Sequence, residues 1–189
     1  MNNKIPFIIY AESTPNPSVM KFVSNQILTK KSQEYLNIKD TAKGTLLRKL
    51  FSFPFVKEIF ISTNYISIRK HDSIDWVDVT NQIRIFIQEE LNNQIEVEKL
   101  SNKRVDIKQT KSELILEIEK VIDDNIRSNI QMDGGDIEVI SCENGVLKLL
   151  LQGACSGCPS SQITLKNGIE NLLKEQFPKR INEVIAIND

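Results

Sequence analysis

The residues best suited to chemistry are two cysteines, Cys155 and Cys158, in the stretch 153–161. Two thiols separated by two residues can both reach one metal ion, and the glycines beside them let backbone amides approach the sulfurs. The pair follows an apolar run and precedes a helix-like segment, so we expect the positive helix start to favour the thiolate forms. The stretch therefore predicts half of a metal site or a redox-active dithiol.

Several interpretations of this pair stay open. An iron-sulfur cluster usually takes four thiolates, so a cluster bound here would have to be shared between two subunits. A thioredoxin-like thiol-disulfide oxidoreductase also carries its dithiol at a helix start, although no aromatic residue precedes Cys155 here. A structural zinc site would need two more ligands. The third cysteine, Cys142, falls on a predicted strand, where we expect a small buried hydrophobic residue. Two incidental cysteines in a tight turn are the last alternative.

Composition narrows the class of protein. The chain has 24 Lys and Arg against 25 Asp and Glu, so its net charge of -1 predicts no attraction to nucleic acid or to an acidic membrane. No apolar run approaches the roughly 20 residues of a membrane span, and the first residues lack the features of a signal or transit peptide. Three cysteines are too few for a disulfide framework. We therefore expect a cytoplasmic protein with reduced thiols.

The length of 189 residues predicts two small domains, 1–95 and 112–189. Between them, the mostly polar segment 96–111 predicts a linker that does not order itself. Apolar periodicity in the first domain predicts strands over 5–12 and 19–24, a helix over 41–50 capped by Thr41 or Thr45, a hairpin over 56–69, and a helix from Asp72 or Ser73 to about Leu91. The one histidine, His71, is expected to be a solvated loop residue rather than a ligand.

The second domain has a clearer pattern around the cysteines. Gly134 and Gly135 are expected to end its first helix, and Asn144-Gly145 predicts a hairpin turn. The expected elements are a helix from Ser112 to about Ile130, strands over 137–142 and 146–151, a helix from Ser160 or Ser161 to Phe177, and a strand over 184–187. The fold class is therefore α+β, with two small mixed domains and the order α-β-β-α-β in the second, where the cysteine loop precedes the second helix.

Two groups of residues resemble a known family. In the second domain they are Met132-Asp133-Gly134-Gly135-Asp136 and Leu151-Gln152-Gly153-Ala154-Cys155-Ser156-Gly157-Cys158-Pro159-Ser160-Ser161, and together they resemble the C-terminal domain of NifU, the Nfu-type domain. In the first domain they are residues 10–22, with Ser13-Thr14-Pro15-Asn16-Pro17-Ser18, then residues 50–57 and Asp75-Trp76. These look like the N-terminal domain that accompanies it in two-domain Nfu proteins.

The resemblance implies an iron-sulfur cluster scaffold or carrier, not an enzyme. Such a protein would hold a 4Fe-4S cluster between two copies of the second domain, with Cys155 and Cys158 as the ligands, and the turn 133–136 would pack near the loop without ligating iron. The implied partners are a second copy of the chain, upstream cluster assembly proteins and apo iron-sulfur proteins. The other domains of NifU are not present in the sequence, so carriage and delivery are expected rather than assembly from iron and sulfide.

Overall fold

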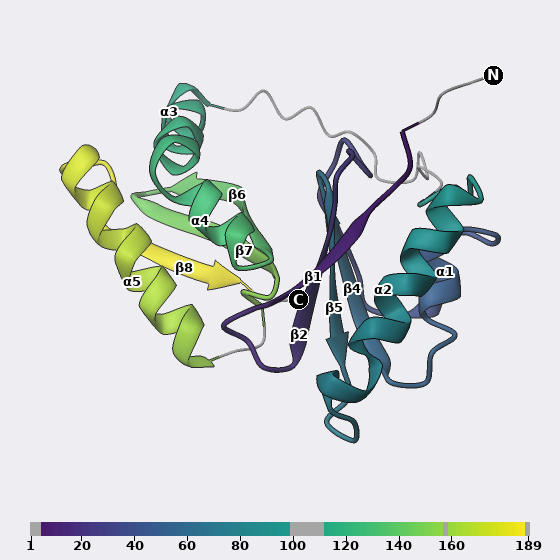
Figure 1. Ribbon diagram of the computed structural model, residues 1–189. Coiled ribbons are helices and arrows are strands. Elements are labelled where there is room, and N and C mark those ends of the chain that lie inside the picture. Colours follow the sequence, from purple (N-terminus) through teal and green to yellow (C-terminus); the bar gives the residue numbers. More distant parts are fainter. Residues whose placement is uncertain (1–4, 99–111, 157–158, 188–189) are drawn as a thin grey trace. The chain divides into compact units, whose positions relative to one another are not determined.

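The computed structural model describes residues 5–98, 112–156 and 159–187 (Figure 1). The chain divides into two compact units, Met1–Arg104 and Val105–Asp189. Most of the expected linker, 99–111, and the candidate ligand Cys158 lie outside the described residues. No helix among the described residues is long and apolar enough to cross a membrane.

The first unit is built on an antiparallel five-stranded sheet with the order β1-β2-β5-β4-β3. Its strands are β1 (Ile9–Ser13), β2 (Val19–Ser24), β3 (Gln33–Tyr35), β4 (Val56–Ser62) and β5 (Tyr65–Lys70). β1 begins at Ile9 rather than at residue 5 because Ile9 pairs with Ser24, where the partner strand ends. Beyond that pair, the Asn25 side chain bonds the backbone of Ile8 and Pro6 instead. The short β3 was not predicted.

Two helices, α1 (Leu46–Leu50) and α2 (Trp76–Asn92), cover one face of this sheet (Figure 1). Thr45 caps α1 by accepting a hydrogen bond from the Arg48 amide, so this prediction is confirmed. The helix is shorter than expected, because residues 41–45 form a turn in which Gly44 has a positive φ of 81°; a separate 3-10 turn, η1 (Ile38–Asp40), comes before them. α2 begins after Asp75, which lies three residues beyond Asp72 and two beyond Ser73, the predicted caps.

The segment that follows α2 packs back onto the first unit. The amides of Leu46 and Leu47 donate to the carbonyl oxygens of Glu96 (2.9 Å) and Val97 (3.2 Å). The Glu98 carboxylate accepts hydrogen bonds from the Thr29 hydroxyl (2.7 Å) and from the Tyr35 hydroxyl. The expectation that the polar segment does not order itself is therefore wrong for residues 96–98, because the start of α1 and two distant hydroxyls supply partners that composition does not reveal.

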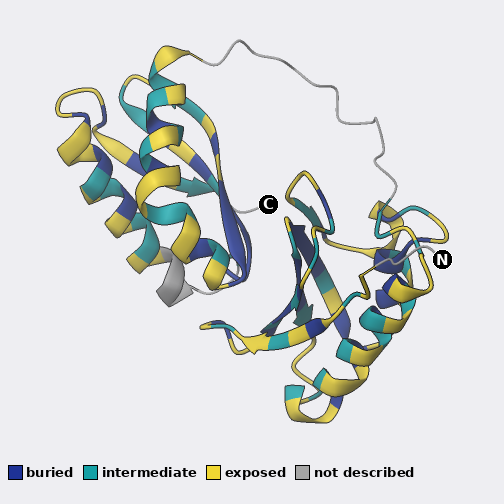
Figure 2. Ribbon diagram, turned by 45° about the horizontal axis from the view of Figure 1, so that its top comes forward, coloured by how far each residue is buried: buried dark blue, intermediate teal, exposed yellow. Residues whose placement is uncertain are grey.

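The second unit has the predicted order α-β-β-α-β. Its elements are α3 (Glu113–Ile122), η2 (Asp123–Arg127), α4 (Ser128–Met132), β6 (Gly135–Glu143), β7 (Val146–Gly153), α5 (Pro159–Gln176) and β8 (Glu183–Ile187). β7 lies at the centre of the sheet, antiparallel to β6 and parallel to β8. Ser112 caps α3 as predicted. The helices and one face of the sheet share a core, which Figure 2 shows in dark blue.

Two details of this unit differ from the prediction. The first helical run is interrupted by η2, a single π-helical turn. Apolar spacing alone does not reveal such a turn, because the residues on both sides keep a helical period. The last helix begins at Pro159, before the predicted caps Ser160 and Ser161, and a proline in the first helical position needs no amide partner. The hairpin turn is as predicted, since Asn144 (φ 52°) and Gly145 (φ 78°) both have positive φ.

Candidate metal centre

Two strand ends bring the Asp-Gly-Gly-Asp turn beside the cysteine loop. Gly135, the first residue of β6, pairs with Gly153, the last residue of β7. Immediately beyond this pair, the Ala154 amide donates to the carbonyl oxygen of Gly134 at 3.1 Å. The turn therefore packs against the loop, as expected, and the next residue in the loop is Cys155.

Gly135 forms a cradle for the Cys155 sulfur. A Cβ atom placed on Gly135 would lie 2.6 Å from Sγ of Cys155 and 2.7 Å from the carbonyl oxygen of Gln152. Real Cβ atoms essentially never come so close to other atoms, so a side chain at this position would displace the thiol. Gly134 has a different role, because its φ of +82° is a turn conformation that favours glycine. Of the two glycines, only Gly134 needs positive φ to end the helix.

Cys155 is buried as part of the core of the second unit, with 8% of the residue's surface exposed. The pKa of its thiol is raised to about 12, chiefly by burial and in smaller part by the negative charges of Asp133 and Asp136. The expectation that the helix start favours the Cys155 thiolate is wrong. The helix dipole acts only within about the first turn, and α5 begins four residues after Cys155, so desolvation outweighs it.

Cys142 lies far from this cradle. We predicted a small buried hydrophobic residue at this position, and Cys142 is partly buried against the same core. Burial raises the pKa of its thiol, and the positive charge of Arg180 opposes that shift. Cys142 is seven residues along β6 from Gly135, which corresponds to roughly 20 Å at the rise of a strand. It cannot ligate the same ion as Cys155 without rebuilding the sheet.

The described part of the chain has no group of three or more His, Cys, Asp or Glu side chains that could hold a metal ion. His71 is exposed at the end of β5 in the other unit, in agreement with its predicted role as a solvated residue. Of the candidate pair, Cys155 is in place in its glycine cradle, while Cys158 lies outside the described residues. A thiol-only donor set suits iron-sulfur clusters and soft metals rather than Mg²⁺ or Ca²⁺.

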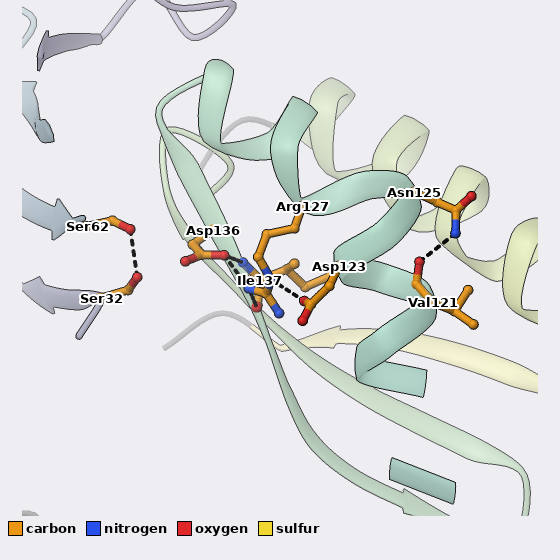
Figure 3. Close-up of polar contacts among 8 residues, drawn as sticks. All are labelled: Ser32, Ser62, Val121, Asp123, Asn125, Arg127, Asp136 and Ile137. Carbon is orange, nitrogen blue, oxygen red and sulfur yellow. Dashed lines mark hydrogen bonds and ion pairs between the residues drawn. The ribbon is translucent and has the colours of Figure 1, made fainter. Parts of the chain in front are cut away.

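An ion pair with a buried carboxylate, beside the cradle, was not predicted. Asp136, whose side chain is 6% exposed, accepts a hydrogen bond from Nη1 of Arg127 at 2.5 Å. Figure 3 shows Arg127 reaching from η2 to Asp136 and to the carbonyl oxygen of Ile137. One signal was available, because a charged residue at the start of an apolar strand needs a cation when it is buried. The sequence after residue 111 has two arginines, Arg127 and Arg180, and their spacing from Asp136 does not indicate which of them pairs with it.

Sequence comparison matches the two units to two protein families. Residues 9–94 match the N-terminal domain of the scaffold protein Nfu/NifU, and residues 118–185 match the NifU-like domain. Together these matches include both described units and the cysteine loop.

Curated relatives are similar over nearly the whole chain. The chain is 34% identical over 184 residues to a Drosophila persimilis protein named NFU1 iron-sulfur cluster scaffold homolog, mitochondrial, covering 93% of this chain and 64% of the relative. It is 31% identical over 172 residues to the Arabidopsis thaliana NifU-like protein 4, mitochondrial, covering 87% and 61%. The chain thus spans less than two thirds of these relatives. A solution structure of a Saccharomyces cerevisiae NifU-like protein has a TM-score of 0.45 at 21% identity, over 53% of this chain and 92% of that one.

The names of these relatives correct one expectation. Both are mitochondrial proteins by name, so the predicted cytoplasmic location is contradicted. That prediction rested on the lack of long apolar runs and on sparse cysteines. These features indicate reduced thiols and no membrane span, but they do not distinguish one compartment from another.

Proposed function

The chain belongs to the two-domain Nfu family, with an Nfu/NifU N-terminal domain followed by a NifU-like domain, and on this premise we propose that it is an iron-sulfur cluster carrier. In this proposal Cys155 and Cys158 ligate a 4Fe-4S cluster that two subunits share. The cluster is cargo, which the dimer passes to apo iron-sulfur proteins. The role is non-catalytic, and upstream assembly proteins supply the cluster.

One observation carries the proposal, namely that the thiol site is incomplete within one chain. A cluster takes four thiolates, whereas the NifU-like unit offers Cys155 and Cys158, and Cys142 is roughly 20 Å away along its strand. Two copies of the same loop supply the missing pair. A dimer with two-fold symmetry presents the same surface from each subunit, so both loops can meet at the axis.

The incomplete site also accounts for release. Opening the dimer removes two of the four ligands at once, so affinity for the cargo falls steeply when the subunits separate. The buried Cys155 thiol, with its raised pKa, favours the protonated form once the metal leaves. Cluster transfer is thus accompanied by proton uptake at Cys155.

The same thiol argues against the alternative of a thioredoxin-like oxidoreductase. A dithiol enzyme attacks disulfides as a thiolate, and its nucleophilic cysteine has a lowered pKa. The pKa of Cys155 is raised instead. A metal, which displaces the proton by direct bonding, is a better partner for this thiol than a disulfide.

Anaerobic reconstitution of the purified chain with iron and sulfide tests the proposal. We expect a brown dimer with about four irons and four sulfides per two chains. Cys155→Ala and Cys158→Ala should each abolish cluster binding, whereas Cys142→Ala should bind normally. A colourless monomer, zinc as the only bound metal, or insulin reduction by a chain that never binds iron would each contradict the proposal.

A further inference from the structure

The outer edge of the sheet in the first unit is only partly covered. β1 is at one end of the strand order, so one side of its backbone faces away from β2. Ile8 bonds on the β2 side, where its amide donates to Oδ1 of Asn25 at 3.0 Å and its carbonyl oxygen accepts from the Asn25 amide at 3.2 Å. Bonded and unbonded positions alternate along an antiparallel pair, so Phe7, Ile9 and Ala11 direct their backbone groups outward.

Side chains of α2 cover the first part of this edge. Asn92 accepts the Phe7 amide at 2.9 Å and donates to the Phe7 carbonyl oxygen at 3.1 Å. Gln88, one helical turn earlier, accepts the Ile9 amide at 3.1 Å. Edge strands whose polar groups are covered in this way are protected from pairing with another chain. The edge is therefore closed at Phe7 and at the Ile9 amide.

The next turn of α2 does not continue this cover. Arg84 lies one turn before Gln88, and its Nε and Nη2 donate to Oδ1 of Asn81 on the same helix, at 3.2 and 2.9 Å. Among the residues that the structure describes, no hydrogen bond reaches the Ala11 amide or carbonyl oxygen, and no carboxylate pairs with Arg84. The edge is therefore open at Ala11, with a cation on the neighbouring helix.

A hollow of about 440 Å³ lies at the open part of the edge. Its walls are residues 8–11 and four residues of α2, Val77, Thr80, Asn81 and Arg84. Two of the apolar side chains that border it are largely in solvent, since Val77 is 88% exposed and Tyr10 is 57% exposed. The hollow thus combines apolar walls, unpaired backbone groups and a guanidinium, which are the features that an extended acidic chain would use.

We propose that this hollow binds an extended acidic segment of a partner protein, which pairs with β1 as an added edge strand and places a carboxylate against Arg84. In strand addition the backbone hydrogen bonds give the affinity, and here the Ala11 amide and carbonyl oxygen supply them. The guanidinium gives the specificity, because its planar donors match a carboxylate. The inference goes beyond the proposed function, since all of these residues belong to the first unit.

Charge argues against a second copy of this chain as the occupant. If two β1 strands paired symmetrically about Ala11, each copy would present the same groups to the other. The two Arg84 side chains, which line the hollow together with Ala11, would then face each other with like charge. Like charges brought together at an interface are costly, whereas an acidic segment is complementary to Arg84. A different protein is therefore the better partner.

The test selects a phage-displayed library of random peptides, each of about ten residues, which is enough for one strand, against the full chain without cluster. Fluorescence anisotropy then gives the affinity of each selected peptide for the wild type, Arg84→Glu, Ala11→Pro and Gln82→Glu. Proline at position 11 removes the outward amide, a change that an edge strand tolerates. Gln82→Glu is the matched control, because it adds a negative charge at an exposed position of α2 outside the hollow. Unfolding temperatures check that each variant is folded.

We expect the selected peptides to share an Asp or Glu and to bind Arg84→Glu at least about tenfold more weakly than the wild type. Replacing that acidic residue of the peptide by Lys should restore binding to Arg84→Glu. Ala11→Pro should lose binding, and Gln82→Glu should bind as the wild type does. Bound peptide should slow hydrogen exchange at the Ala11 amide of the wild type, but not at the Ile9 amide, which Gln88 already bonds.

Three results would each overturn the inference: a library that yields no binding peptide, peptides that bind Arg84→Glu as tightly as the wild type, or unchanged exchange at the Ala11 amide. Dimerisation of the cluster-free chain that protects this amide would overturn the choice of partner and favour a second copy. If Ala11→Pro does not fold, the charge exchange at Arg84 and the exchange rate at Ala11 still decide the question. None of these measurements involves the cluster, so reconstitution tests the proposed function separately.

Discussion

The backbone of Gly135 lies directly against the sulfur of Cys155, so closely that a Cβ on Gly135 would be 2.6 Å from Sγ. These residues are twenty positions apart, and the pairing of β6 with β7 brings them together. The contact links the Asp-Gly-Gly-Asp turn to the cysteine loop and explains why the second glycine of the turn has no side chain.

Gly135→Ala is expected to impair cluster binding and to destabilise the second unit. The new methyl group must displace the Cys155 thiol or the Gln152 carbonyl, and overpacking of this kind typically costs about 1–3 kcal/mol. Cluster content after reconstitution and urea unfolding measure the two effects. Gly168→Ala is the control, because a Cβ on that α5 glycine meets nothing within 4 Å and should stabilise the helix by up to about 1 kcal/mol. Normal cluster content in Gly135→Ala would show that the cradle does not position the thiol.

The buried thiol predicts a loss of stability at alkaline pH. The pKa of Cys155 in the folded chain is raised to about 12, above its ordinary value of 9.0. The folded state therefore holds the proton more tightly than the unfolded state does. This contribution to stability is complete below about pH 9 and is lost as the pH rises toward 12.

Urea unfolding of the cluster-free protein at about pH 8 and about pH 10.5 measures this effect. The wild type should lose more stability between the two conditions than Cys155→Ala, which has no thiol to titrate. Other groups titrate in both proteins, so the difference isolates Cys155. Equal losses in the two proteins would mean that the thiol is not buried in solution.

Glu98→Gln is expected to loosen the segment that follows α2. The carboxylate accepts hydrogen bonds from Thr29 and Tyr35, and hydrogen bonds to a charged group contribute about 1.5–3 kcal/mol each. Hydrogen exchange should become faster at the amides of Leu46 and Leu47, which donate to the backbone of this segment. Glu90→Gln, which breaks an ion pair with Lys49 on the same unit, should leave those two amides unchanged. Unaltered exchange in Glu98→Gln would contradict the docking of this segment.

Gly145→Ala should destabilise the chain more than Gly44→Ala. Both glycines have positive φ, +78° and +81°, so each substitution introduces backbone strain of about 1 kcal/mol. At Gly145 the new Cβ would also lie 2.4 Å from Nδ2 of Asn182, whereas at Gly44 it would meet nothing within 4 Å. Thermal unfolding of the two variants compares them. Equal destabilisation would show that Asn182 moves aside without cost.

The features that depend on neighbouring residues were predictable from the sequence. Apolar periodicity predicted β2, the β4–β5 hairpin and the α-β-β-α-β order of the second unit. Side-chain oxygens placed before an apolar helical period identified the cap Ser112 and gave Thr45 as one of two candidate caps, with Thr41. Asn144-Gly145 identified a tight turn because both positions need positive φ. These signals act within a few residues of the chain, where sequence and geometry are directly coupled.

The features that depend on distant residues were decided only by the tertiary structure. The cysteine spacing pointed to a metal site, but whether Cys155 is exposed or buried depends on the packing of β6, β7 and the helices around it. Burial reversed the expected direction of its pKa shift, because desolvation is set by the whole fold whereas the helix dipole is a local effect. The same holds for the Arg127–Asp136 pair and for the anchoring of Glu98, which join segments that no spacing rule relates. The sequence by itself determined which residues can ligate a metal, and the tertiary structure decided the charge, burial and close contacts that surround them.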